Sequence, residues 1–172
     1  MIDAGAAAKA FDSETFRPVL RGRKFEDFEV GQWIEHHWGR TFTAADAVMF
    51  ATATCHWLPM YLNVEYARRH GHPDMVIPPM LVLGVVVGLS VEDLSESGGP
   101  FLGISDCQFI RPLYAGDTVS ARSTVLSARR SKSRLNVGVV TWRTEGVDQY
   151  GATAISYVRS NLVAFRGHEP KI

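Results

Sequence analysis

The sequence predicts an α+β domain in which one long central helix is wrapped by a curved antiparallel sheet. Residues 79–95 are apolar on nearly every helical face, which is typical of a buried helix. One strand-like run precedes this helix, and four β-rich runs separated by turn signals follow it. With 172 residues, of which 46% are hydrophobic, the chain can bury one core, and we expect a single domain.

The first predicted strand leads directly into a short helix. Residues 33–42 follow a glycine turn and alternate loosely between apolar and polar side chains, a pattern that favours a strand. Thr43 and Asp46 then match the form of a capping box, in which each side chain bonds the other residue's backbone N–H. A helix is therefore expected over residues 47–53.

Two further helices are expected before the sheet resumes. Asn63 can cap a helix over residues 64–70, because its side chain can accept from a free N–H of the first turn. The long helix covers residues 79–95 and contains Gly84 and Gly88, which lie on one face. We expect these glycines to let the sheet approach the helix backbone closely.

The remaining strands and the domain limits follow from the turn signals. Strands are predicted at residues 104–111, 118–129, 135–143 and 152–165. We place a loose N-terminal tail at residues 1–23, the domain at residues 24–166 and a short C-terminal tail at residues 167–172.

Composition excludes several classes of function. The 18 basic and 18 acidic side chains balance, whereas nucleic-acid binding usually requires a basic surface, so we expect no such partner. Cys55 and Cys107 have no metal-ligand or disulfide spacing, which indicates a reducing cytoplasm and no metal site. The most apolar stretch, residues 76–94, is interrupted by prolines, glycines and acids, so we expect no membrane span.

Several segments resemble one known family in sequence and order. They are Phe-Glu-Asp-Phe-Glu-Val-Gly at residues 25–31, Gly-Arg-Thr-Phe-Thr at 39–43, Pro-Met-Tyr-Leu-Asn-Val-Glu-Tyr-Ala at 59–67, the helix at 83–94, and Phe-Ile-Arg-Pro-Leu-Tyr-Ala-Gly-Asp-Thr at 109–118. The chain is similar to the MaoC-like hydratases and dehydratases of the hotdog fold, which include R-specific enoyl-CoA, mesaconyl-CoA and itaconyl-CoA hydratases. The resemblance implies a homodimer or higher homo-oligomer, an acyl-CoA or carrier-bound thioester substrate, and no metal or redox cofactor.

The resemblance also implies where a catalytic site would lie. The family uses an Asp and a His, five residues apart, to activate water, and these positions fall on His56 and Tyr61. Imidazole titrates at about 6.5 and can act as base and acid, whereas a phenol with a pKa of about 10 is a hydrogen-bond donor at pH 7. The family's oxyanion donor at the helix start falls on Pro79, which has no N–H, and the N–H of Met80 could replace it.

Neighbouring residues are assigned to the substrate-binding region. Trp57 would make the entrance bulkier, and Asn63 stands where the family has an acid. Cys55 beside His56 admits a thiolate nucleophile for acyl transfer, but a helix-end Cys is more often a small core residue. Three arginines are the candidates to meet a CoA phosphate or a substrate carboxylate: Arg40, Arg111 and Arg143.

Three functions remain open on the sequence. The first is a hydro-lyase acting on a small or branched enoyl thioester, with His56 as acid and base and Tyr61 as donor. The second is an inactive acyl-binding or scaffold subunit, in which His56 merely ends a helix and Tyr61 fills the pocket. The third is a diverged thioesterase or a secondary-metabolism enzyme.

Overall fold

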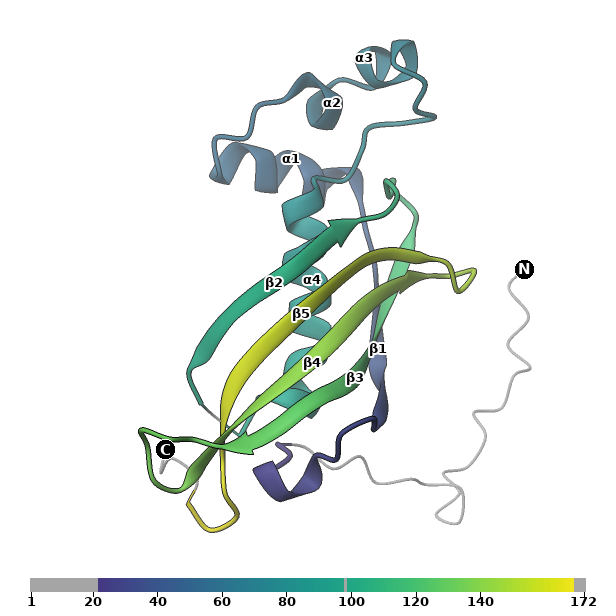
Figure 1. The fold of residues 1–172 in the computed structure, drawn as a ribbon. Helices are drawn as coiled ribbons and strands as arrows, with labels where there is room; N and C mark the ends of the chain where they lie inside the picture. The colour runs from purple at the N-terminus through teal and green to yellow at the C-terminus, as the bar shows by residue number, and fades with distance from the viewer. Residues whose placement is uncertain (1–21, 98, 169–172) are drawn as a thin grey trace, which may run out of the picture.

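The computed structural model describes residues 22–97 and 99–168 (Figure 1). Most of the two predicted tails, residues 1–21 and 169–172, lies outside the described residues. The elements in chain order are η1 (Phe25–Asp27), β1 (Trp33–Thr41), α1 (Ala44–Ala53), α2 (Pro59–Leu62), α3 (Val64–Arg69), α4 (Pro79–Leu94), β2 (Phe101–Phe109), β3 (Thr118–Arg130), β4 (Val137–Asp148) and β5 (Thr153–Ala164). The predicted α+β class is confirmed.

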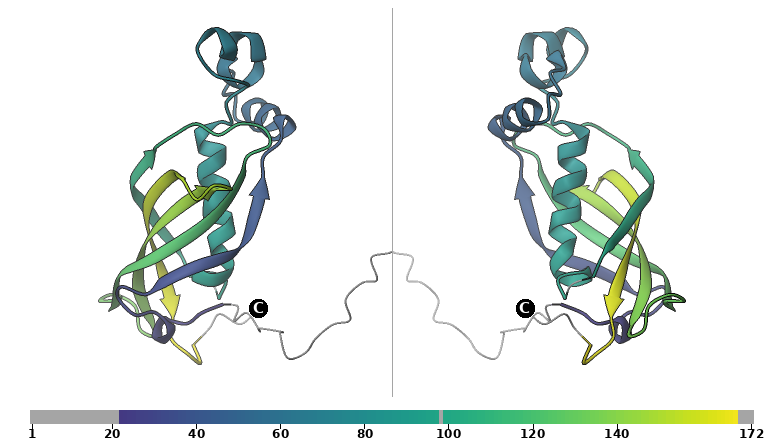
Figure 2. Two further views of the ribbon diagram at one scale, coloured as in Figure 1. Left: turned by 90° about the vertical axis from the view of Figure 1, so that its right-hand side faces the viewer. Right: turned by 90° about the vertical axis from the view of Figure 1, so that its left-hand side faces the viewer.

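The five strands form one antiparallel sheet in the order β1-β3-β4-β5-β2. The sheet curves around α4, and α1, α2 and α3 gather beyond one end of it (Figures 1 and 2). Strands β1 and β2 are the edges, and both carry irregularities in register, between Glu35 and Gly39 and between Ser105 and Gln108. Such bulges increase the local twist of an edge.

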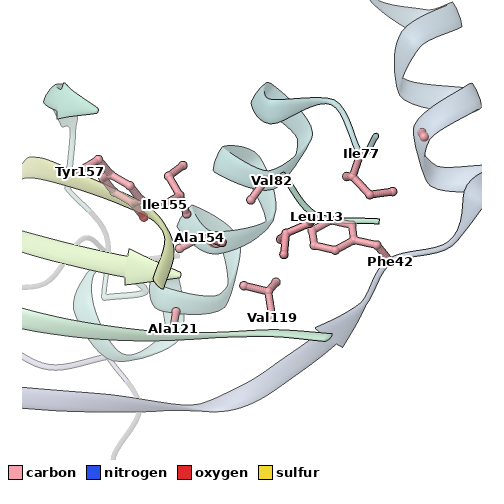
Figure 3. Close-up of a cluster of buried hydrophobic side chains, with 11 residues drawn as sticks. Phe42, Ile77, Val82, Leu113, Val119, Ala121, Ala154, Ile155 and Tyr157 are labelled. Atoms are coloured by element: carbon pink, nitrogen blue, oxygen red, sulfur yellow. The ribbon is translucent and has the colours of Figure 1, made fainter. Parts of the chain in front are cut away.

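One face of α4 packs on the sheet. Val82, Val86 and Ser90 are buried and recur every four residues, so they share that face. Figure 3 shows Val82 among core residues from the sheet and from the loops that lead to it. The core cluster at this end comprises Phe42, Ala47, Ile77, Val82, Val86, Leu113, Val119, Ala121, Ala154, Ile155 and Tyr157.

The glycines of α4 lie on the opposite face, which corrects the expectation drawn from the sequence. Gly84 and Gly88 are exposed, and a Cβ built on either would meet nothing within 4 Å. The close approach is made instead by Gly146 of β4, where a Cβ would lie 2.6 Å from a methyl carbon of Val86. A helical pattern alone does not say which face meets the sheet, and here the branched side chains bury more apolar area.

The other end of α4 is held by a buried polar network. His36 Nδ1 lies 2.7 Å from Asp93 Oδ2, and His36 Nε2 lies 2.8 Å from Ser123 Oγ. Ser123 Oγ is in turn 2.8 Å from Thr144 Oγ1. Buried polar groups are costly unless they are hydrogen-bonded, and here every member of the network has a partner. The network therefore fixes α4 against β1, β3 and β4.

Candidate functional site

The end of α1 sets the position of His56. The N–H of Cys55 donates to Thr52 O at 3.4 Å and that of His56 donates to Ala51 O at 2.8 Å, the pair of bonds that defines a Schellman motif. Cys55 occupies the left-handed position of this motif with φ 56°, where glycine is usual. The expectation that Cys55 is a core residue is wrong, because its side chain is exposed.

The His56 and Tyr61 side chains, to which the resemblance assigned the catalytic positions, lie together. Pro59 occupies the first turn of α2, and the Tyr61 N–H donates to Leu58 O at 2.9 Å. The His56 and Tyr61 rings meet edge to face, with centroids 5.2 Å apart. His56 is exposed, whereas Tyr61 is buried against Ala51 and Val76.

Burial also fixes the protonation state of the phenol. Desolvation raises the pKa of Tyr61 above its ordinary value of 10.0. The phenol therefore stays protonated at neutral pH and can donate a hydrogen bond, but it cannot serve as a base.

The start of α4 presents a free backbone donor. Pro78 is the N-cap and accepts from the N–H groups of Leu81 and Val82 at 2.9 and 3.1 Å. Pro79 follows it and has no N–H, so Met80 carries the first N–H of the helix, at a position that has no acceptor within the helix. The helix dipole gives this end a partial positive charge, which favours a developing oxyanion.

A cavity of about 200 Å³ opens beside the start of α4. Ile77, Val82 and Ala154, all visible in Figure 3, belong both to the core and to its wall. The described residues on the wall are Val76, Ile77, Pro79, Val82, Phe109, Ile110, Arg111, Pro112 and Ala154. His56 and Tyr61 do not themselves line this cavity, although the resemblance implied that they would face the substrate. Val76 belongs both to the wall and to the buried cluster that contains Tyr61, and the His56 ring contacts the Tyr61 ring.

The other predicted binding residues lie farther from this cavity. Trp57 is 65% exposed and the Met80 side chain 51% exposed, so both face solvent in the single chain. The Asn63 side chain accepts from the Tyr66 N–H at 3.0 Å and caps α3, as the sequence also predicted. Of the predicted binding residues, Pro79 and Arg111 are the two on the cavity wall.

Most residues of the cavity wall could not be identified from the sequence. Phe109, Ile110 and Ala154 are ordinary apolar strand residues, and nothing in their pattern distinguishes a cavity wall from a packed core. Arg111 was one of three candidate arginines, and the fold alone singles it out.

Some kinds of site are absent from the part of the chain that the structure describes. No group of three His, Cys, Asp or Glu side chains there could hold a metal ion. Within the same residues, no helix has the length and hydropathy to cross a bilayer.

Comparison with known proteins identifies relatives over nearly the whole chain. The family model described as mesaconyl-CoA hydratase matches residues 3–170. A mesaconyl-CoA hydratase of Haloarcula hispanica is 37% identical over 163 residues, which cover 90% of this chain and 46% of that protein.

Solved structures share the fold. A putative MaoC domain protein dehydratase of Chloroflexus aurantiacus superposes with a TM-score of 0.80 at 30% identity, covering 87% of this chain and 43% of that one. A Mycobacterium tuberculosis protein described as a double hotdog fold has a TM-score of 0.73 at 22% identity, covering 87% of this chain and 47% of that one. The hotdog fold predicted from the sequence is confirmed, and the chain spans about half the length of the curated relatives that it matches.

Proposed function

This chain belongs to the mesaconyl-CoA hydratase family, and on that premise we propose that it is a hydro-lyase that adds water to a small or branched enoyl thioester, or removes it. The observation that carries the proposal is the contact between the His56 and Tyr61 rings, which Val76 links to the wall of a small apolar cavity at the start of α4. A cavity of about 200 Å³ fits a short acyl group.

The chemistry requires a base, an acid and an oxyanion donor. His56 accepts a proton from water as the water oxygen bonds to the β carbon of the double bond. The electron pair of the double bond moves to the thioester oxygen, which the Met80 N–H stabilises. The imidazolium then returns the proton to the α carbon, and Tyr61 donates a hydrogen bond that orients the reacting groups. The net change is the addition of one water molecule.

The assay that tests this proposal uses the purified chain and a panel of enoyl-CoA thioesters. The panel contains linear and branched acyl groups of three to six carbons, with and without a second carboxylate. We expect saturable hydration of at least one branched member, followed as loss of the conjugated thioester absorbance. Hydration of none of them would reject the proposal.

The residues at the proposed catalytic positions favour one alternative. On the resemblance described above, the family's Asp and His fall on His56 and Tyr61, and its oxyanion donor falls on Pro79, which has no N–H. The alternative is a non-catalytic subunit that binds an acyl group beside an active partner. It predicts that the chain binds a thioester by calorimetry while hydrating none of the panel.

The proposed partner is a second copy of this chain. The outer face of α4 forms an apolar groove of about 430 Å³ lined by Arg40, Phe50, Leu81, Gly84, Val85, Gly88 and Leu89. The edge strand β2 and the residue after it also expose large apolar side chains, among them Phe101, Leu102, Phe109 and Ile110. An open sheet edge and an apolar helix face on one unit favour pairing, and relatives of twice the length have room for a second unit.

The proposed location is the cytoplasm. Cys55 and Cys107 are both unpaired, which supports a reducing compartment.

Gly88→Leu is expected to weaken this dimer by at least about tenfold. A Cβ at Gly88 meets nothing within 4 Å among the described residues, so the variant should fold, while its larger side chain fills the groove that the second copy would occupy. Sedimentation should give about twice 19.0 kDa for the parent and a concentration-dependent shift towards the monomer for the variant. Arg69→Leu adds the same side chain to the exposed end of α3 and is the control. Equal dimerisation of the parent, Gly88→Leu and the control would reject the groove as the interface.

A further inference from the structure

The fold separates the three candidate arginines. Arg40 is paired with Asp46 at the start of α1 and borders the groove on the outer face of α4. Arg143 is exposed on β4. Arg111 lies on the wall of the 200 Å³ cavity and is the single charged side chain among the described residues there.

The position of Arg111 is well defined. The N–H groups of Ile110 and Arg111 both donate to Ala154 O, at 2.8 and 3.4 Å, which fixes the backbone where the chain leaves β2. The guanidinium donates through Nη2 to the Asp148 carboxylate. Asp148 also accepts from the N–H groups of Tyr150 and Ala152, at 2.9 and 2.8 Å.

These bonds keep the carboxylate of Asp148 ionised. Burial raises the pKa of Asp148, but the backbone N–H groups of Ala152 and Tyr150 and the Arg111 guanidinium outweigh it, so the pKa lies below its ordinary value. Asp148 therefore holds one edge of the guanidinium in place, while its carboxylate also accepts hydrogen bonds from two backbone N–H groups.

Arg111 retains donor capacity after this pairing. A guanidinium has five N–H donors, and Nε of Arg111 is shielded from solvent with no hydrogen-bond partner in the described part of the chain. Nε is closed to a ligand, but the Arg111 side chain as a whole is 36% exposed, so N–H groups at Nη1 and Nη2 can meet a ligand in the adjacent cavity. A carboxylate matches the planar fork of a guanidinium in two parallel bonds.

We infer that Arg111 is a specificity-determining residue that binds a free carboxylate on the acyl group of the thioester. This inference rests on the proposed function, because it assigns one end of the same substrate. The cavity wall also includes Pro79, beside the Met80 N–H that is assigned to the thioester oxygen. A short acyl group with a carboxylate at its far end is thus held at both ends, while the apolar wall contacts the carbons between them. An acyl group without the carboxylate leaves the guanidinium unsatisfied.

The test compares two thioesters that differ in one group. One is a short branched enoyl-CoA with a terminal carboxylate, and the other is the same compound with that carboxylate converted to a carboxamide. The first measured quantity is the kinetic preference, which is kcat/KM for the carboxylate divided by kcat/KM for the carboxamide. The second is the binding preference, which is the dissociation constant of the carboxamide divided by that of the carboxylate, measured by calorimetry. We expect Arg111→Met to lower both ratios by about 10- to 100-fold, the loss expected for a charge-assisted hydrogen bond, mainly through KM.

A second variant and a control keep the result decisive. Arg111→Lys keeps a positive charge beside Asp148 but loses the planar fork, so it should fold even if Arg111→Met does not, and should lower the preference by a smaller factor. Arg122→Met is the control, since Arg122 also pairs with a carboxylate, Glu145 at 2.8 Å, and does not line the cavity. An unchanged preference in both Arg111 variants would overturn the inference. If the parent hydrates neither thioester, the proposed function fails, and the calorimetric ratio still decides the role of Arg111.

Discussion

Replacing His56 with alanine is expected to lower kcat/KM for the best enoyl-CoA substrate by about 10²- to 10⁴-fold, the range that general acid and base catalysis contributes. The exposed imidazole is the group of the His56 and Tyr61 pair that can take a proton from water at neutral pH, because burial keeps the Tyr61 phenol protonated. The loss should fall mainly on kcat, because the proposed role of His56 is proton transfer in the transition state rather than binding of the substrate. Initial rates of hydration over a range of substrate concentrations give both constants.

His70→Ala is the matched control. His70 is also exposed, and its ring stacks on Tyr66 with centroids 4.2 Å apart, at the end of α3. This variant should remain within about threefold of the parent, the scatter expected away from the reacting atoms. A His56→Ala protein as active as the His70→Ala protein would remove His56 from the mechanism and favour the non-catalytic subunit.

The largest loss of stability is expected for Trp142→Ala, at about 3–5 kcal/mol in the free energy of unfolding. Trp142 is fully buried in a second core cluster, together with Phe28, Ile34, Leu94, Val125, Val140 and Val163. Its ring meets Phe28 edge to face at 5.2 Å and lies 5.5 Å from the Arg159 guanidinium carbon. Truncation leaves a cavity and removes the ring on which a buried cation rests. Urea unfolding should be followed by far-ultraviolet circular dichroism, because the substitution changes the tryptophan fluorescence.

Trp33→Ala gives the comparison for that measurement. Trp33 begins β1 and is 58% exposed, so its loss should change the unfolding free energy by less than about 1 kcal/mol. Equal midpoints for the two variants would mean that the second core cluster contributes little to stability.

Local signals in the sequence predicted α1, α3 and α4, but the short helix α2 at Pro59–Leu62 was not predicted. The capping box of Thr43 and Asp46 is present at the start of α1, and Asn63 caps α3. Both rely on side chains that bond their own neighbours, so no tertiary information is needed. The long helix was placed correctly for the same reason, since its proline start and apolar run are local features.

Tertiary contacts decided what the sequence could not. Strand β4 runs to Asp148 rather than stopping at Arg143, because Thr144 bonds Ser123 and Glu145 pairs with Arg122 across the sheet. Glu145 and the Gly146 that follows it are residue types depleted in strands, so their own preferences argue against this extension. Gly84 and Gly88 were assigned to the wrong face of α4 because only the packed fold shows which face meets the sheet. The residues of the cavity wall could not be told from core residues for the same reason.

The buried polar network of His36, Asp93, Ser123 and Thr144 resembles a catalytic triad in geometry but not in accessibility. Asp93, His36 and Ser123 follow one another at bonding distances, the arrangement that a geometric template for serine hydrolases seeks. Ser123 is 1% exposed, so no ester or amide carbon can reach its oxygen. Template searches that ignore accessibility would therefore give this chain a false hydrolytic label, and a solvent filter on the serine would remove it.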